Sequence, residues 1–264
     1  MIDPTLVLVL AVLGTITGFL AGLLGIGGAM LMVPVITFLL RSRGYPADIT
    51  AKIAVATSLA TICFTSMSSV RAHQKRGAVR WDLVRLLAPG LVIGALGGAH
   101  LAVTLPGAWL AIFFGVFLIV SGTQMAIDRK PKVSRSLPPP ALTGGVGLAI
   151  GTLAALVGAG GAFMTVPFMT WCNVRIHEAV GTSAALGFPI ALAGTLGYLW
   201  AGRDLPALPW TAGYLYLPAL LFVSVASILL APAGARMAHR LDVRLLRRLF
   251  SVVLYALAGY MLWK

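Results

Sequence analysis

Charged side chains are the scarcest feature of this sequence. Only 10% of its 264 residues are charged, whereas 59% are hydrophobic. A soluble domain carries about a quarter charged residues, which it needs to cover its surface. No charged residue lies between Pro4 and Leu40, and further uncharged runs occupy 86–127, 136–174 and 205–235. Each run is longer than the roughly 20 apolar residues that cross a bilayer as a helix. The sequence therefore predicts an all-α polytopic membrane protein.

Cysteine and acidic residues are also scarce. Cys63 and Cys172 lie in or beside apolar segments, which gives neither a disulfide framework nor a metal cluster. All seven acidic residues fall in expected loops or at helix ends, so no proton relay, catalytic pair or metal site is expected at membrane depth. We expect no enzymatic activity and no cofactor. The net charge of +13 comes from cations in short connections, which indicates membrane topology and not a nucleic-acid partner.

Ten apolar segments can be drawn along the chain, and helix is expected for each because a helix satisfies its own backbone in lipid. They cover 5–24, 28–40, 50–70, 84–103, 107–127, 141–158, 161–172, 179–200, 211–231 and 245–263. The most linker-like interval is 128–140, where charged residues precede three prolines. This interval divides the chain into a first transmembrane repeat (1–127), a cytoplasmic linker (128–140) and a second transmembrane repeat (141–264).

The two halves of the chain repeat each other. Residues 14–38 align with 147–171 at a constant offset of 133, with twelve identities in twenty-five. A second match, later in the chain, pairs 54–58 with 179–183, and a weaker third follows in the same order. Three ordered matches indicate a duplicated unit of five segments. Because five is odd, the two copies are expected to have inverted topology.

The basic connections predict the orientation of the chain. The positive-inside rule places 71–82, 128–140 and 236–248 in the cytoplasm, and it places 104–106 and 201–210 outside. Both termini are then extracytoplasmic. Inverted repeats recur in secondary transporters, whose substrate lies near the midplane between the repeats.

Three glycines in four residues occur at equivalent places in both halves. They are Gly25, Gly27 and Gly28 in the first half, and Gly158, Gly160 and Gly161 in the second. Each glycine in a helix interior costs about 1 kcal/mol relative to alanine, whereas a backbone break with φ > 0 favours glycine and exposes N–H groups that can hold an anion. Helices begin directly after both motifs, so their N-termini would face the break. The alternative is close helix packing through small residues. Duplication favours the break, and we predict that these glycines bind substrate.

The pairs Thr57-Ser58 and Thr182-Ser183 form a second duplicated motif. Hydroxyls can donate to an anion without carrying charge, and Thr57 begins a polar stripe that continues with Thr61 at a spacing of four. Alternatively, such hydroxyls bond back to carbonyls of their own helix. The sequence leaves both interpretations open, and all four residues are included among the predicted substrate-binding residues.

These motifs resemble the TauE/SafE family of sulfite exporters. The resemblance is carried by 18–28, Val33-Pro34 and Ala56-Thr57-Ser58, and the second-half copy at 158–161, Val166-Pro167 and Gly181-Thr182-Ser183 is similar to the internal repeat of that family. The resemblance covers nearly the whole chain. It implies a transporter of the cell inner membrane that exports small sulfur-containing oxyanions such as sulfite or organosulfonates.

Other function classes stay open to different degrees. An anion channel or facilitator for another small anion would also fit a site without carboxylates, and flux without saturation would distinguish it from a carrier. A structural subunit gives no reason to break two helices at equivalent places. The expected partners are a small anion and the lipid bilayer. The sequence does not determine the energy coupling or whether the protein forms a homo-oligomer.

Overall fold

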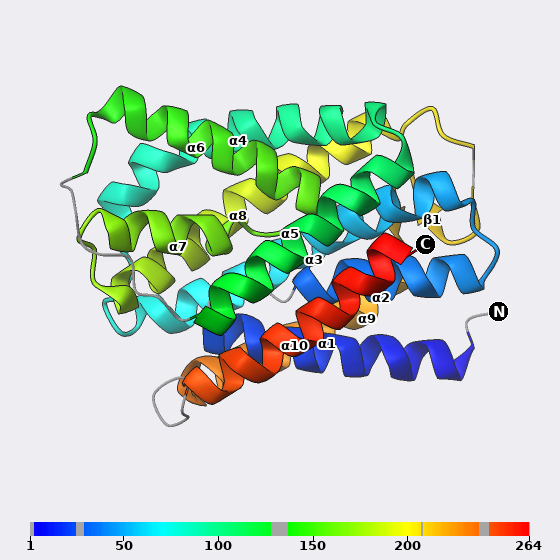
Figure 1. The fold of residues 1–264 in the computed structure, drawn as a ribbon, viewed down its shortest axis with the longest axis horizontal. Coiled ribbons are helices and arrows are strands. Elements are labelled where there is room, and N and C mark those ends of the chain that lie inside the picture. The colour runs from blue at the N-terminus through cyan, green and yellow to red at the C-terminus, as the bar shows by residue number, and fades with distance from the viewer. Residues whose placement is uncertain (1–2, 25–28, 128–136, 207, 238–242, 264) are drawn as a thin grey trace.

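The computed structural model describes residues 3–24, 29–127, 137–206, 208–237 and 243–263, which form ten helices and one short β-hairpin (Figure 1). Seven of these helices are long and apolar enough to cross a membrane. The elements are α1 (Pro4–Leu24), α2 (Ala29–Ser42), α3 (Ala47–Gln74), α4 (Trp81–Thr104), α5 (Gly107–Ile127), α6 (Pro140–Val157), α7 (Ala162–Trp171), α8 (Ile176–Ala201), β1 (Thr211–Ala212), β2 (Leu215–Tyr216), α9 (Leu217–Met237) and α10 (Val243–Trp263). The expectation of an all-α polytopic fold is confirmed.

The predicted start of one helix is wrong. The sequence predicts a helix over 211–231, but α9 begins at Leu217, and the residues before it pair as the antiparallel strands β1 and β2. Trp210 and Gly213 have φ angles of 59° and 56°, which are incompatible with a helix. Tyr214 and Tyr216 are buried, so these apolar residues fold back onto the protein instead of extending α9. Hydropathy alone does not distinguish the two outcomes.

Two ends of the molecule can be distinguished by their contacts. At one end, the Asp48 carboxylate accepts the Gly107 backbone N–H (2.7 Å), and the Lys52 ammonium donates to the Val103 carbonyl oxygen (3.0 Å). This end also carries β1, the start of α1 and the end of α10, and we call it the hairpin end (Figure 1). The opposite end, which we call the basic end, carries the connections 75–80 and 172–175.

Close glycine contacts join helices of opposite halves. Along α4, a Cβ atom on Gly98 would lie 2.5 Å from the Thr152 carbonyl oxygen of α6. Along α1, a Cβ atom on Gly18 would lie 2.4 Å from the Ser227 Cα of α9. Real Cβ atoms do not approach other heavy atoms so closely, so these positions admit only glycine. Small residues that let backbones approach are typical of membrane helix interfaces.

We predict that Gly98→Ala destabilises the protein, because the added methyl group meets the backbone of α6, which cannot move without separating the helices. Gly97→Ala is the matched control on the same helix, since nothing lies within 4 Å of its Cβ position. The expected loss for Gly98→Ala is about 1–3 kcal/mol, whereas Gly97→Ala should be neutral or stabilising. Thermal unfolding in detergent measures both. Equal melting temperatures would contradict the packing assignment.

The helices that carry the Thr-Ser pairs, α3 and α8, pack against each other in opposite directions. A Cβ atom on Gly194 would lie 2.8 Å from Leu59 Cδ1, while one on Gly187 would lie 3.7 Å from Ser66 Cβ. Residue numbers therefore rise along one helix as they fall along the other. Around this central pair, α4 packs along α6 and α1 packs along α9. In both pairs, a helix of the first half therefore packs along a helix of the second half.

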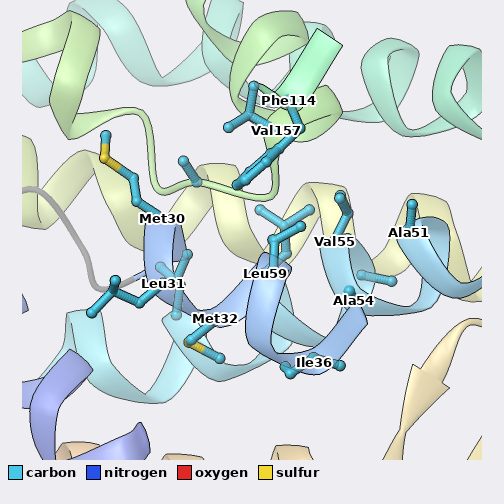
Figure 2. Close-up of a cluster of buried hydrophobic side chains, with 14 of the residues drawn as sticks. Met30, Leu31, Met32, Ile36, Ala51, Ala54, Val55, Leu59, Phe114 and Val157 are labelled. Atoms are coloured by element: carbon cyan, nitrogen blue, oxygen red, sulfur yellow. The ribbon is translucent and has the colours of Figure 1, made fainter. Parts of the chain in front are cut away.

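The largest hydrophobic core lies beside this central pair (Figure 2). Met30 and Met32 of α2 pack with Val55 and Leu59 of α3, and all four are at most 2% exposed. Val157, the last residue of α6, reaches the same cluster. Although α2 is only 14 residues long, most of its apolar side chains are buried, and this burial fixes the position of the helix.

Candidate functional site

The second glycine motif breaks the chain between two helices. Gly158 ends α6 and Gly161 precedes α7, and both have a φ angle of 71°. Only glycine adopts this left-handed backbone without strain. A Cβ atom on Gly158 would also lie 3.0 Å from the backbone of Val55. Both the left-handed backbone and the lack of room for a Cβ atom therefore require glycine at residue 158. The expected break between the two helices is present.

The break lies near mid-depth in the molecule. A Cβ atom on Gly160 would lie 3.2 Å from Ile62 Cγ2 and 3.6 Å from Gly187 Cα, and these residues lie near the middle of α3 and α8. From here α7 runs to the basic end. Its ten residues span about 15 Å, half of a hydrocarbon core about 30 Å thick. The Ala162 and Phe163 N–H groups have no hydrogen-bond partner within the described part of the chain. The positive end of α7 thus faces the centre.

The first glycine motif cannot be compared directly, because Gly25, Gly27 and Gly28 lie outside the described residues. The helices that flank it are described. The first, α1, ends at Leu24, and α2 begins at Ala29, so a helix boundary occurs where the repeat predicts one.

A cavity of about 40 Å³ lies beside the α6–α7 break, between α1, α2, α3, α7, α8 and α9. This volume holds roughly three water molecules. The backbone of the break contributes Gly160 and Ala162. No charged residue lines the cavity, but six hydroxyl side chains do: Thr17, Thr65, Ser66, Ser69, Ser183 and Ser227. The cavity therefore has an uncharged lining, rich in hydroxyl groups, next to a helix N-terminus.

Most of the cavity hydroxyls are engaged with protein atoms. Thr65 donates to the Thr61 carbonyl (3.1 Å), and the Thr17 and Ser227 hydroxyls lie 3.3 Å apart. Ser69 is different, because it is 4% exposed and its Oγ has no hydrogen-bond partner among the described residues. Leaving a buried hydroxyl unpaired costs about 1–3 kcal/mol. A protein that retains such a group next to a cavity leaves a donor free for a ligand.

The two predicted serines occupy equivalent but unequal places. Ser183 lines the cavity, and its Oγ lies 2.7 Å from the Thr165 hydroxyl of α7. Ser58 does not line the cavity, and its Oγ lies 4.0 Å from the Met32 Sδ of α2. The repeat offset relates Met32 to Thr165. The serine therefore contacts a hydroxyl in the second half and a thioether in the first. The polar surface accordingly lies beside α7.

The two predicted threonines contact the opposite half and not the cavity. The Thr57 hydroxyl donates to the Ile53 carbonyl (2.7 Å) and accepts the backbone N–H of Tyr216 (2.9 Å), the residue before α9. The Thr182 hydroxyl accepts the backbone N–H of Arg80 (2.9 Å), the residue before α4. Each threonine therefore holds the start of a helix that belongs to the other half.

We predict that Thr57→Val and Thr182→Val destabilise the protein by about 1–3 kcal/mol each, because each leaves a buried or part-buried backbone N–H without its acceptor. Thr57→Ser and Thr182→Ser keep the hydroxyl and should retain most of the stability. Thermal unfolding gives the ranking. If the valine variants melt like the parent but transport with a much higher KM, the threonines contact substrate instead.

Aromatic side chains close the hairpin end. The Tyr45 phenol donates to the Pro209 carbonyl, and the Arg43 guanidinium donates to the Tyr216 hydroxyl (3.4 Å). Burial raises the pKa of Tyr45, which further favours the protonated phenol that donates this hydrogen bond. These contacts join the connection before α3 to the hairpin before α9.

Sequence reasoning missed several cavity residues. Thr17, Ser66 and Ser227 come from helices that lie side by side only in the fold. Thr17 and Ser227 stand in otherwise apolar helices, and Ser66 does not fall on the polar stripe at a spacing of four, so none of the three is marked by the sequence pattern. Continued at its spacing of four, the polar stripe that begins at Thr57 and Thr61 reaches Thr65 and Ser69, and that stripe was the one available indication.

Comparisons with known proteins cover the same helices. The family described as sulfite exporter TauE/SafE matches residues 10–261. A probable membrane transporter protein of Haemophilus influenzae is 32% identical over 263 residues, which cover 98% of this chain and 99% of the relative. Another, of Methanocaldococcus jannaschii, is 28% identical over 258 residues, covering 96% and 94%. No solved structure matches the chain. Its motifs, its apolar helices and these matches together show that the chain is a multi-pass membrane protein and belongs to the TauE/SafE family of sulfite exporters.

Proposed function

We propose that this protein is a secondary transporter that exports a small sulfur-containing oxyanion, such as sulfite or an organosulfonate, across the cell inner membrane. The observation that carries this proposal is the cavity beside the α6–α7 break. There, the N-terminus of α7 and the hydroxyl of Ser69, which has no partner among the described residues, face a space near mid-depth. Helix N-termini and hydroxyl donors together suit an oxyanion.

The neutral character of the cavity fits transport. A buried cation would bind an anion tightly and slow its release, whereas hydroxyls and backbone N–H groups supply donors without a full charge. Room for roughly three water molecules suits an ion of a few heavy atoms such as sulfite. A larger organosulfonate would need the helices around the cavity to separate.

We also propose that the two halves form inverted repeats, with both termini extracytoplasmic, and that transport proceeds by motion of one half against the other. The antiparallel packing of α3 and α8 supports this arrangement, since these helices carry equivalent motifs. The exchanged contacts of Thr57 and Thr182 support it as well. Cysteine labelling from each side, after removal of Cys63 and Cys172, tests the topology. Finding 71–82 and 236–248 on opposite faces would contradict it.

A flux assay in proteoliposomes tests the proposed substrate. Sulfite, thiosulfate, sulfate and sulfoacetate are offered in turn, and the expected result is saturable movement of at least sulfite. Movement of none of these anions would contradict the proposal. Voltage-driven flux that never saturates would identify an anion channel instead of a carrier.

A further inference from the structure

A second hollow lies on the other side of α3, between the C-terminal parts of α3 and α9. Its volume is about 620 Å³. Cationic side chains, among them Arg71, Lys75 and Arg236, line one part, and the apolar side chains of Phe64 and Ile228 line another. We call it the basic groove. It shares no lining residue with the cavity beside α7.

The basic groove opens to the side of the helix bundle. Its residues Phe64 and Arg71 of α3, and Lys75 directly after the helix, recur at helical spacing, whereas Ile62 and Ser69, which line the cavity, lie on a different face. Phe64 is 46% exposed, whereas Ile62 is 5% exposed. The face that holds the groove therefore points away from the protein interior, toward the region that lipid occupies in a membrane.

The two ends of the basic groove differ in the polarity of their side chains. The Ser68 hydroxyl donates to the Ile228 carbonyl (3.3 Å), and Thr57 contacts Tyr216 eleven residues earlier on α3, so α3 and α9 run parallel. Both helices place apolar residues first and cations last, toward the basic end. The eleven residues from Phe64 to Lys75 span about 16 Å along a helix, which matches one leaflet of a hydrocarbon core about 30 Å thick.

Three of the cations in the groove are available to a ligand. Arg71, Lys75 and Arg236 are exposed, and none forms an ion pair with a carboxylate in the described ranges. The groove lining contains no acidic residue. A small anion dissolved in water would need only the cationic side chains. An amphiphile with a phosphate headgroup and a hydrocarbon tail would need both the cationic and the apolar side chains.

We propose that the basic groove binds an anionic phospholipid. The headgroup phosphate lies against Arg71, Lys75 and Arg236, and an acyl chain follows Phe64, Met67 and Ile228 toward the membrane centre. Basic pockets between transmembrane helices are known to select such headgroups. This site is independent of the transported anion, because the two hollows lie on different faces of α3.

Lipid binding to the purified, delipidated full-length protein tests this proposal. Native mass spectrometry measures the affinity for phosphatidylglycerol and for phosphatidylcholine, and we expect tighter binding of phosphatidylglycerol. Each cation near a lipid headgroup is worth about a fivefold change in affinity, so Arg71→Gln/Arg236→Gln should weaken phosphatidylglycerol binding by about thirtyfold. The matched control is Arg85→Gln/Arg203→Gln, which removes the same charge from exposed positions outside the groove and should bind like the parent.

A second measurement separates binding from misfolding. Phosphatidylglycerol should raise the melting temperature of the parent and of the control, but not that of the groove variant. Equal binding of both lipids, or equal losses in the groove and control variants, would overturn the proposal. Displacement of phosphatidylglycerol by millimolar inorganic phosphate would also overturn it, because the groove would then be a site for free anions.

Discussion

Gly187→Val is expected to abolish anion transport while folded protein remains in the membrane. A Cβ atom on Gly187 would lie 3.5 Å from the Gly160 carbonyl oxygen and 3.7 Å from Ser66 Cβ, which are ordinary contact distances. The backbone therefore accepts a side chain here. The two methyl groups of valine would then occupy a cavity that holds only roughly three water molecules. Flux of sulfite into proteoliposomes should fall to the level of empty vesicles.

The matched control is Gly97→Val on α4, which adds the same side chain where nothing lies within 4 Å of the Cβ position. It should transport like the parent, since it does not reach the cavity. Detergent-solubilised yield and melting temperature verify that both variants fold. Normal transport by folded Gly187→Val would show that the substrate passes elsewhere.

Ser69→Ala should change transport and stability in different ways. If the Ser69 hydroxyl donates to a desolvated anion, its loss removes about 1.5–3 kcal/mol of binding, which is roughly a ten- to hundredfold rise in apparent KM. Because this hydroxyl has no partner among the described residues, its removal should leave the free energy of unfolding unchanged or higher. Initial rates over a range of sulfite concentrations, together with thermal unfolding, give both quantities.

Ser121→Ala is the control for Ser69→Ala. The Ser121 hydroxyl on α5 is likewise buried and without a partner within the described ranges, but it does not line the cavity. Its removal should also preserve or raise stability, and the KM should stay the same. A similar KM for the parent and for Ser69→Ala would remove Ser69 from the substrate site.

The helices were largely predictable from the sequence, because bilayer thickness and the need to satisfy the backbone leave few alternatives to apolar helices. Every predicted segment contains a helix. One predicted helix is longer than the observed one. At 211–216, buried aromatic residues belong to a hairpin, which hydropathy cannot distinguish from the end of a helix. The break at Gly158 to Gly161 was predictable because clustered glycines oppose helix formation.

The candidate site was predictable only in part. Gly160 and Ser183 of the duplicated motifs line the cavity, and their contact with substrate stays a prediction. Thr57 and Thr182 carry the same type of hydroxyl, but neither lines the cavity, and each accepts an N–H group from the opposite half. Sequence spacing shows which face of a helix a hydroxyl occupies. It does not show which residue, far away in the chain, forms a hydrogen bond with that hydroxyl in the folded protein.

The central claim is that a small oxyanion occupies the cavity beside the N-terminus of α7. Selenite resembles sulfite in shape and charge, and its selenium atom gives an anomalous X-ray signal that locates it directly. Diffraction from crystals of the full-length protein grown with selenite is therefore the most direct test. We predict an anomalous peak between the Ser69 and Ser183 hydroxyls and the backbone of Gly160 to Ala162, and no peak in crystals of Gly187→Val. A peak confined to the basic groove, or no peak in the parent protein, would contradict this account.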